Sequence, residues 1–574
     1  MNADGLMVYY ERIADAPSAV DRLRRFLLDL AVRGRLVPQE SEDEPASELL
    51  KRIAAEKVRL VKAGEIGRGK PLPDIDSDEV PYEVPSGWQW TRIRRVTGDR
   101  GQTVPDCDFT YIDVTAINKE VGRVEGARVT SASEAPSRAR KVVGKGDVLY
   151  SCVRPYLLNV AIVDNEISPR PIASTAFAVL HGFGLVLPRY QWIVLRSPFM
   201  VACVETKMRG QAYPAINDSD FALLPFPLPP LAEQHRIVAK VDELMALCDR
   251  LEAARTAREA TRDRLAAATL ARLNAPDPDT FQDDARFALD ALPALTTRPD
   301  QITQLRQTIR NLAVRGRLVP QDPNDEPASE LLSYITRTRK KLYAEGKIPK
   351  PKSLVPINES DWPFSLPAGW SWSRLGDLCY QVSDGPHFSP QYVAADQGVP
   401  FLSTRNVRPE GFDLSSVKYV SRADHEEFCK RIRPERNDII YTKGGTTGIA
   451  RVNDLEFEFS VWVHLAVLRT EKERLYPRYV ALALNSPHCY GQSQRYTQGI
   501  SNFDLGLTRM IKITIPLPPL EEQRRVVAKV DELTALCDRL EASLSARDDT
   551  RCRLLAALLA EALLPASTEL EAAR

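Results

Sequence analysis

Several signatures of catalysis are missing from this sequence of 574 residues. It contains no GxxxxGK(S/T) phosphate-binding loop, no GxSxG nucleophile turn, no HExxH metal motif and no cysteine and histidine grouping at zinc spacing. The six histidines are scattered, and His387 and His464 are interpreted as structural side chains. The glycine-rich run at 444–448 is interpreted as a turn between strands, because no helix start clearly follows it. The sequence therefore predicts no catalytic centre.

Net charge, paired cysteines and long apolar runs are missing as well. Lys plus Arg and Asp plus Glu number 77 each, so any basic surface must be local. The nine cysteines include no CxxC pair and are odd in number, which is typical of reduced core residues in a cytosolic protein. No signal peptide is visible, and no run approaches the roughly eighteen apolar residues of a membrane helix. We therefore expect a cytoplasmic protein with no membrane contact.

The sequence contains an internal repeat, because segments of its first half return in its second half. The segment LPPLAEQHRIVAKVDELMALCDRLEA at 228–253 returns as LPPLEEQRRVVAKVDELTALCDRLEA at 517–542, with 22 of 26 positions identical. LAVRGRLVPQ at 30–39 recurs unchanged at 312–321, followed both times by DEPASELL. The repeat unit is one half of the chain, far longer than the repeats of a solenoid.

The long repeated segment is predicted to be a helix. Prolines open it and acidic residues follow in its first turn, where both are favourable. Apolar residues then recur at alternating spacings of four and three, which is the pattern of a coiled-coil seam; they are Ile237, Val241, Leu244, Cys248 and Leu251, with counterparts Val526, Val530, Leu533, Cys537 and Leu540. The seam could pack on the short helices, through Leu23 and Leu27 or their counterparts Leu305 and Ile309, or on the opposite long helix.

Between its helices, each half contains a globular domain that begins near a pair of tryptophans. Short apolar bursts bounded by Gly, Pro, Asn and Asp indicate strands and turns, with one or two helices near each domain's end. The two domains share only isolated anchors, such as Asp147 with Asp438 and Asn217 with Asn502, although the helices around them match closely. The two halves therefore share one arrangement of helices, but their globular domains should differ in what they bind.

Basic residues cluster inside these domains among Asn, Gln, Thr, Ser and Tyr, the side chains that contact phosphates and base edges. The clusters lie at 92–100 and 138–154 in the first domain and at 405–443 in the second. For each cluster alone, a solvated charged face is an equally good interpretation. A helix over 231–272 would span roughly 60 Å, longer than the roughly 34–36 Å between DNA half-sites one turn apart.

The chain resembles the specificity subunit of type I restriction-modification systems over nearly its whole length. The resemblance rests on the two PLPPLxEQ helix openings, the GRLVPQ and DEPASELL segments, and the domain starts PSGW at 85–88 and PAGW at 367–370. Within the domains, EAPSRARK, KGDVLYSCVRPYL, YPAIN, SDGPHFSP and NDIIYTKGGTTGIARV look like two subtypes of target recognition domain.

The resemblance implies an α+β fold in which two mixed α/β target recognition domains are separated by long helices that form an antiparallel coiled coil, with a pseudo-twofold internal repeat. The expected segments are a helical region at 1–80, a recognition domain at 81–230, a spacer helix at 231–275, a linker with a second helical region at 276–360, a second recognition domain at 361–519 and a second spacer helix at 520–574.

The resemblance also implies partners. Double-stranded DNA would be read as a split and asymmetric site, with two adenine methyltransferase subunits and ATP-dependent restriction subunits bound to the chain. No cofactor is expected on this chain, because S-adenosylmethionine, ATP and Mg would belong to the partner subunits.

Candidate contact residues follow from loop position and residue type. For DNA they are Ser151, Arg154, Tyr156, Gln211 and Tyr213 in the first domain, and Thr404, Arg405, Asn406, Lys443, Thr446, Thr447 and Gln498 in the second. The outer charges of the first long helix are expected to face the methyltransferase; they are Glu233, Arg236, Lys240, Asp242 and Glu243. Simple solvation is the alternative interpretation of those charges.

Two other functions remain open at this point. The chain could serve a system that only methylates, which this sequence does not distinguish from one that also cleaves. It could also be a non-enzymatic coiled-coil scaffold whose two domains bind proteins, which its neutral net charge permits.

Overall fold

The computed structural model describes residues 15–66, 72–76, 79–210, 213–499 and 503–563. By its internal contacts the chain divides into two units. Unit 1 comprises Met1–Arg258 with Asp548–Arg574, and unit 2 comprises Glu259–Arg547. The two long helices, α9 (Leu231–Asn274) and α19 (Leu520–Leu563), each begin in one unit and end in the other.

The recognition domain of unit 1 is built on three sheets. A two-stranded antiparallel sheet at its base joins β1 (Gln89–Arg92) to β11 (Pro225–Leu228), directly before α9. The other sheets have the strand orders β10-β7-β8-β4-β3 and β5-β2-β9-β6. Their strands are β2 (Phe109–Ile112), β3 (Ile117–Asn118), β4 (Arg123–Val124), β5 (Arg128–Thr130), β6 (Ala139–Val142), β7 (Val148–Ser151), β8 (Val160–Ile162), β9 (Pro171–Ser174) and β10 (Phe177–Leu180).

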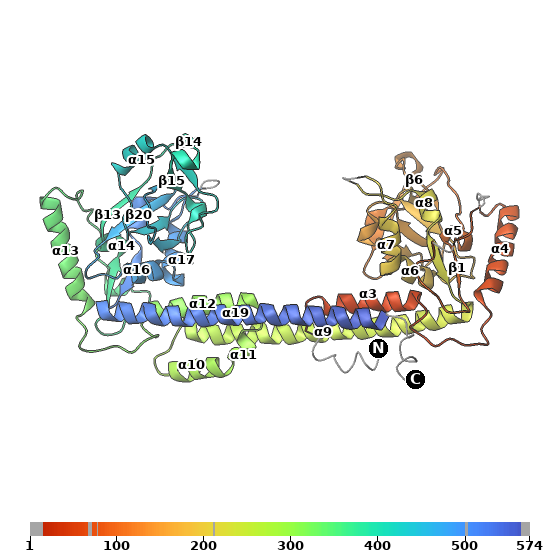
Figure 1. The fold of residues 1–574 in the computed structure, drawn as a ribbon, viewed down its shortest axis with the longest axis horizontal. Helices are drawn as coiled ribbons and strands as arrows, with labels where there is room; N and C mark the ends of the chain where they lie inside the picture. The colour runs from red at the N-terminus through yellow and green to blue at the C-terminus, as the bar shows by residue number, and fades with distance from the viewer. Residues whose placement is uncertain (1–14, 67–71, 77–78, 211–212, 500–502, 564–574) are drawn as a thin grey trace. The chain divides into compact units, whose positions relative to one another are not determined.

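Helices cover the sheets of unit 1 and connect them to α9 (Figure 1). They are α3 (Ala19–Val32), α4 (Ala46–Ala63), α5 (Ile93–Val96), α6 (Pro188–Arg196), α7 (Pro198–Glu205) and α8 (Asp218–Ala222). One apolar core runs from α3 and α4 through β7 and α6 to the first turns of α9, where it includes Ile237 and Val241. Domain and helix therefore share one core.

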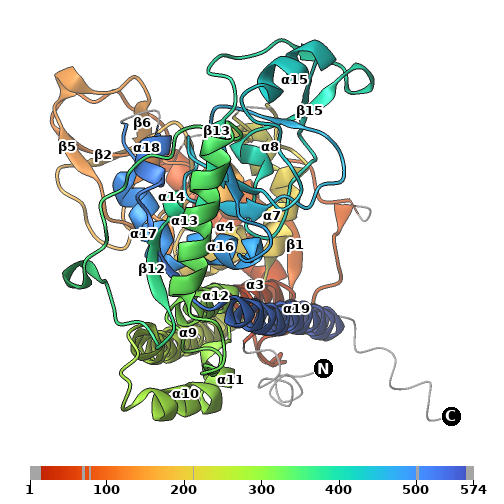
Figure 2. The same ribbon diagram turned by 90° about the vertical axis from the view of Figure 1, so that its left-hand side faces the viewer.

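Unit 2 repeats this plan. Its base sheet joins β12 (Ser371–Arg374) to β21 (Thr514–Leu517), and its larger sheets have the orders β13-β20-β17-β18 and β14-β16-β15-β19. The strands are β13 (Cys379–Asp384), β14 (Tyr392–Val393), β15 (Val399–Leu402), β16 (Lys418–Val420), β17 (Ile439–Thr442), β18 (Ala450–Val452), β19 (Ser460–Val461) and β20 (Leu465–Thr470). The helices, some visible in Figure 2, are α10 (Phe281–Asp290), α11 (Leu292–Leu295), α12 (Pro299–Val314), α13 (Ala328–Ala344), α14 (Leu375–Leu378), α15 (Arg422–Cys429), α16 (Pro477–Leu484), α17 (Pro487–Tyr496) and α18 (Leu507–Met510).

Each short helix contacts both long helices inside its own unit. In unit 1, Arg24 of α3 binds Asp249 and Glu252 of α9, both at 2.7 Å. The same helix donates from Arg22 to the backbone oxygen of Cys552 in α19 at 3.2 Å. In unit 2 the roles of the long helices are exchanged: α12 forms ion pairs with α19, and the side-chain amide of its Asn311 donates to the backbone oxygen of Asn274, the last residue of α9, at 2.8 Å. Each unit thus combines the start of one long helix with the end of the other.

The seam of α19 packs on the short helix α12, one of the two options that the sequence leaves open. In unit 1, Ile237 and Val241 share their core with Leu28 and Val32 of α3 and not with the expected Leu23 and Leu27. In unit 2, Val526, Val530 and Cys537 share an apolar cluster with Ile302 and Ile309 of α12. Cys248 and Cys537, in the middle of the two seams, are both buried and are free thiols.

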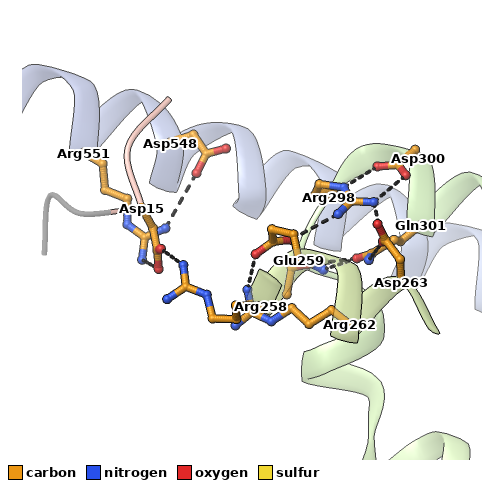
Figure 3. Close-up of polar contacts among 11 residues, drawn as sticks. Asp15, Arg258, Glu259, Arg262, Asp263, Arg298, Asp300, Gln301, Asp548 and Arg551 are labelled. Carbon is orange, nitrogen blue, oxygen red and sulfur yellow. Dashed lines mark hydrogen bonds and ion pairs between the residues drawn. The ribbon is translucent and has the colours of Figure 1, made fainter. Parts of the chain in front are cut away.

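Further ion pairs join the residues that precede α3 and α12 to the long helices (Figure 3). In unit 1, Asp15 accepts from Arg258 of α9 and lies 3.8 Å from Arg551 of α19. In unit 2, Arg298, at the residue before α12, binds Glu259 at 3.1 Å and Asp263 at 2.6 Å. Both sets involve charges of the long helices beyond the repeated 26-residue segment.

The repeated Glu-Gln pair at the start of each long helix forms hydrogen bonds that join the helix to its domain, a contact that we term the lock. Glu233 is 1% exposed and accepts hydrogen bonds from Trp88 Nε1 at 2.9 Å and Gln39 Nε2 at 2.7 Å. The next residue, Gln234, accepts from the backbone N–H of Leu187 at 3.0 Å. The same bonds recur in unit 2; they join Glu522 to Trp370 and Gln321, and Gln523 to Tyr476. This is why GluGln, PxGW and the GRLVPQ glutamine are repeated together.

Candidate nucleic-acid interface

The two recognition domains contain the same loop arrangement, which we term the loop ladder. In unit 1 it comprises residues 152–154, 208–210 and 213–216, and in unit 2 residues 443–445, 498–499 and 503–505. In unit 1, Val153 and Arg209 both form backbone bridges to Ala215. In unit 2, Gly444 and Gln498 both form bridges to Asp504.

The backbone hydrogen bonds of the two ladders also correspond. Arg154 donates its N–H to Pro214 at 2.8 Å, and Gly445 donates to Phe503 at 2.9 Å. The return bonds run from Ile216 to Cys152 at 3.0 Å and from Leu505 to Lys443 at 2.8 Å. The two ladders therefore share a backbone framework, while their side chains differ.

In unit 1 the ladder brings together two of the predicted DNA-contacting residues. The guanidinium carbon of Arg154 lies 4.8 Å from the ring centroid of Tyr213, whose side chain is 69% exposed. Among the described residues, the buried Nε of Arg154 has no hydrogen-bond partner, and stacking on an aromatic ring leaves the N–H groups of a guanidinium free to donate in its own plane. Tyr156, on the short 3-10 turn that follows, is exposed beside it.

Ser151, another predicted residue of unit 1, does not join this surface. Ser151 is 1% exposed, and its hydroxyl donates to the backbone oxygen of Val153 at 2.9 Å, so in this structure it supports the loop from below. Gln211 lies outside the described residues. Sequence reasoning missed two other exposed side chains. Leu157 belongs to the 3-10 turn that carries Tyr156, and Arg209 belongs to the ladder.

In unit 2 the predicted residues divide in the same way. Thr446 and Gln498 are exposed, and Gln498 accepts a hydrogen bond from Arg509 at 3.0 Å. Thr447 and Lys443 are each 4% exposed; Thr447 bonds to the hydroxyl of Thr497 at 3.1 Å. These two side chains do not line the ladder surface. The exposed Phe503, which sequence reasoning missed, does.

Thr404, Arg405 and Asn406 form a 3-10 turn after β15, on a different sheet from the strand that leads into the ladder. Arg405 is exposed. Asn406 is 2% exposed, accepts from the backbone of Ser403 and donates to Asp413 at 2.9 Å. Asn406 therefore holds the turn, and Arg405 is the side chain that the turn presents.

The basic cluster at 92–100 is structural in this fold. Arg92 is 5% exposed and binds Glu79 at 2.6 Å, and Arg100 binds the fully buried Asp147 at 2.7 Å. Both arginines form ion pairs inside unit 1. Neither interpretation from the sequence, a DNA contact or a solvated charged face, describes these two arginines.

The charges at the start of α9 need one correction. Glu233 is buried in the lock described above, and burial raises its pKa despite its two donors, so it is not an outer charge. Arg236 binds Asp43 at 2.5 Å and Glu40 at 3.1 Å, which joins α9 to the segment before α4. The other three charges are partly or fully exposed: Lys240 and Glu243 pair with each other, and Asp242 pairs with Arg189 of α6.

Within the described ranges, no three His, Cys, Asp or Glu side chains are grouped so as to hold a metal ion. The same part of the chain holds no helix of the length and apolar character that crossing a membrane requires. Two α/β units with matched ladders, each sharing its core with long helices, define a two-domain recognition protein.

Comparison with known proteins identifies the family. The profile of the type I restriction modification DNA specificity domain matches residues 145–259 and 367–547. The chain is 32% identical to the specificity subunit of the type I restriction enzyme EcoAI from Escherichia coli, over 94% of this chain and 93% of that subunit. It is 30% identical to the EcoEI specificity subunit of the same organism, over 95% and 94%.

Two solved structures are also similar to this chain. A chain from work on complex assembly and conformational transition of the type I R-M system is 25% identical, with a TM-score of 0.48, and covers 84% of this chain and 99% of its own. The HsdS subunit from Thermoanaerobacter tengcongensis is 25% identical, with a TM-score of 0.42, over 84% and 98%. On the sequence matches, this chain belongs to the type I restriction-modification specificity subunits. It is a non-catalytic DNA-recognition subunit.

Proposed function

We propose that the chain reads a split, asymmetric DNA site, one half with each unit. The observation that carries this proposal is the pair of loop ladders, in which one backbone framework presents two different sets of side chains. Side chains at base edges specify sequence, while phosphate contacts set the register of the protein. Because the two sets differ, the two half-sites should differ as well.

The residues that support this reading are the exposed ones. In unit 1 they are Tyr156, Tyr213 and Arg209, together with the half-buried Arg154 that stacks on Tyr213; in unit 2 they are Arg405, Thr446, Gln498 and Phe503. Arginine binds guanine in the major groove through two donors, and tyrosine supplies both stacking area and a hydroxyl. Gln211 and Thr404 remain candidates on their loops.

The test replaces one arginine of each unit. Arg154→Ala and Arg405→Ala should each lower the affinity of the assembled complex by about 1–3 kcal/mol and relax one position in one half-site. Arg59→Ala, on an exposed face of α4, is the matched control and should change neither. Unaltered affinity and base preference in both variants would show that these arginines do not read DNA.

The partner subunits supply the chemistry in this account. We infer that methyltransferase subunits, two per chain, and restriction subunits assemble on it in the cytoplasm, and that S-adenosylmethionine, ATP and Mg bind to them. Lys240, Asp242 and Glu243 are the remaining candidates for the methyltransferase surface. Asp242 lines a cleft of about 1260 Å³ in unit 1 whose walls carry six basic and six acidic side chains. This balance suits a protein partner better than a DNA backbone.

The salt dependence of DNA binding distinguishes the proposed function from the alternative, a protein-binding scaffold. DNA binding by the chain with its methyltransferase should weaken steeply as salt rises, because each phosphate contact releases counterions. It should also be lost when either recognition domain is replaced. If binding to DNA is absent at low salt, the scaffold is the correct alternative.

A further inference from the structure

Each unit contains a buried lysine that lies between two carboxylates. In unit 2, Lys443 Nζ lies 3.0 Å from Asp504 Oδ1 and 3.4 Å from Asp384 Oδ2, and its side chain is 6% exposed. In unit 1, Lys141 Nζ lies 2.7 Å from Asp218 Oδ2 and 3.4 Å from Asp99 Oδ2, with 3% exposure. Such burial leaves neither ammonium group able to reach a phosphate.

One carboxylate of each group belongs to the ladder or its immediate extension. Asp504 is itself the residue to which Gly444 and Gln498 form bridges. Asp218 begins α8, two residues after Ile216, the last residue of the unit 1 ladder. The lysine therefore contacts the segment that returns beneath the exposed tip of each ladder.

The other carboxylate of each group belongs to a different part of the domain. Asp384 ends β13, where it also binds Arg431 at 2.7 Å. Asp99 lies in the connection that follows α5 and is 3.8 Å from Arg94. An ammonium group between a loop carboxylate and a framework carboxylate fixes the distance between them, because removing it leaves two negative charges without the cation that joins them. The lysines are buried, whereas the loop carboxylates Asp504 and Asp218 are about half exposed.

The two lysines are not sequence counterparts. Lys141 lies in β6, whereas Lys443 directly follows β17, the counterpart of β7. The same contact is thus made from different strands in two domains of different sequence. This recurrence distinguishes it from an incidental ion pair.

We propose that Lys443 and Lys141 are positioning residues for sequence reading, each setting the place of the ladder in its own unit. The inference rests on the proposed function, in which each unit reads one half-site. It also revises the role of Lys443, from a DNA contact to the support of one. The consequence is specific: loss of one lysine relaxes one half of the DNA site only.

The experiment uses the full chain expressed with its methyltransferase, with methylated sites mapped by sequencing. Lys443→Met should lower discrimination at one or more bases of a single half-site at least tenfold and leave the other half unchanged. Lys141→Met should relax the opposite half. Lys443→Arg, which keeps the charge, should retain most of the preference.

The matched control is Lys472 of unit 2. It also bridges two carboxylates, Glu435 at 3.0 Å and Asp438 at 3.4 Å, but has no contact with the ladder in the described structure. Lys472→Met should lower thermal stability without changing base preference. If Lys443→Met fails to assemble, Asp504→Asn removes the loop carboxylate instead and should relax the same half-site.

Two results would overturn the inference. One is a uniform fall in methylation with both half-site preferences unchanged, which means that the lysines only stabilise the fold. The other is an unchanged preference and yield. The proposed function fails in a distinguishable way: methylation by the unmodified complex would then show no half-sites that depend on this chain.

Discussion

At the scale of single residues, burial separates the side chains that hold a loop from those that a loop presents. Ser151, Asn406 and Lys443 were predicted as DNA contacts from loop position and residue type, and in the structure each is buried with its hydrogen bonds made inside the domain. Residue type alone does not distinguish the two roles, because a polar side chain suits a buried hydrogen-bond network as well as a base edge.

Glu233 illustrates the same separation and allows a prediction. Burial raises its pKa, and that of its counterpart Glu522, above the ordinary glutamate value of about 4.3. A raised pKa in the folded state means that the folded chain binds the proton more tightly. This contribution to stability is present below the ordinary pKa and is lost as pH rises through the raised one.

The measurement compares unmodified protein with a Glu233→Gln, Glu522→Gln double variant by thermal unfolding between about pH 4 and neutrality, where a glutamate with a raised pKa titrates. The glutamine amide has no charge to desolvate and its oxygen still accepts from the tryptophan. The unmodified protein should therefore lose stability relative to the variant as pH rises through this range. A difference that stays constant with pH would contradict this assignment.

At the scale of elements, the helices could be predicted from sequence and the loop ladders could not. The repeat, the proline starts and the seam spacing indicate α9 and α19 because helix periodicity is local. Each ladder joins two neighbouring segments to a third that lies far earlier in the chain, through backbone bonds that leave no pattern in side chains. The aligned Asp147 and Asp438 are buried acceptors for Arg100 and Arg469, so the anchors shared by the two domains mark the framework.

Gly34, just after α3, tests how tightly the repeated GRLVPQ segment fits its domain. Its φ is +67°, and a Cβ there would lie 2.5 Å from Pro85 Cγ. Gly64, after α4, has a similar φ of +75° with nothing within 4 Å of such a Cβ. Gly64→Ala should cost about 1 kcal/mol, the cost of a left-handed non-glycine residue.

Gly34→Ala adds the collision with the proline ring to the same backbone cost, so it should destabilise the chain by at least about 1 kcal/mol more than the control. Denaturant unfolding of both variants measures the difference. Equal losses would mean that Pro85 moves away without cost and that the close approach is not a constraint.

At the scale of the whole molecule, the repeat predicts that a half-chain can assemble with itself. Residues 259–274 at the end of α9 are the repeat counterpart of residues 548–563 at the end of α19, which belong to unit 1 together with α3. A fragment of residues 1–290 therefore carries its own version of every element of unit 1. Two copies could supply each other's helix ends.

We expect this fragment to be a dimer by light scattering, to bind methyltransferase and to direct methylation of a palindromic split site. A fragment ending at residue 258, which lacks the helix end, is the control and should not dimerise. If the longer fragment stays monomeric and binds no methyltransferase, the two halves are less equivalent than their sequences indicate.

The central claim is that two units of one chain read two different half-sites. It is tested most directly by sequencing methylated adenines in cells that express this chain with its methyltransferase. The account predicts one motif with two unrelated halves at a fixed spacing, and a change in only one half when the ladder side chains of one unit are replaced. A contiguous motif, or one whose two halves change together, would contradict it.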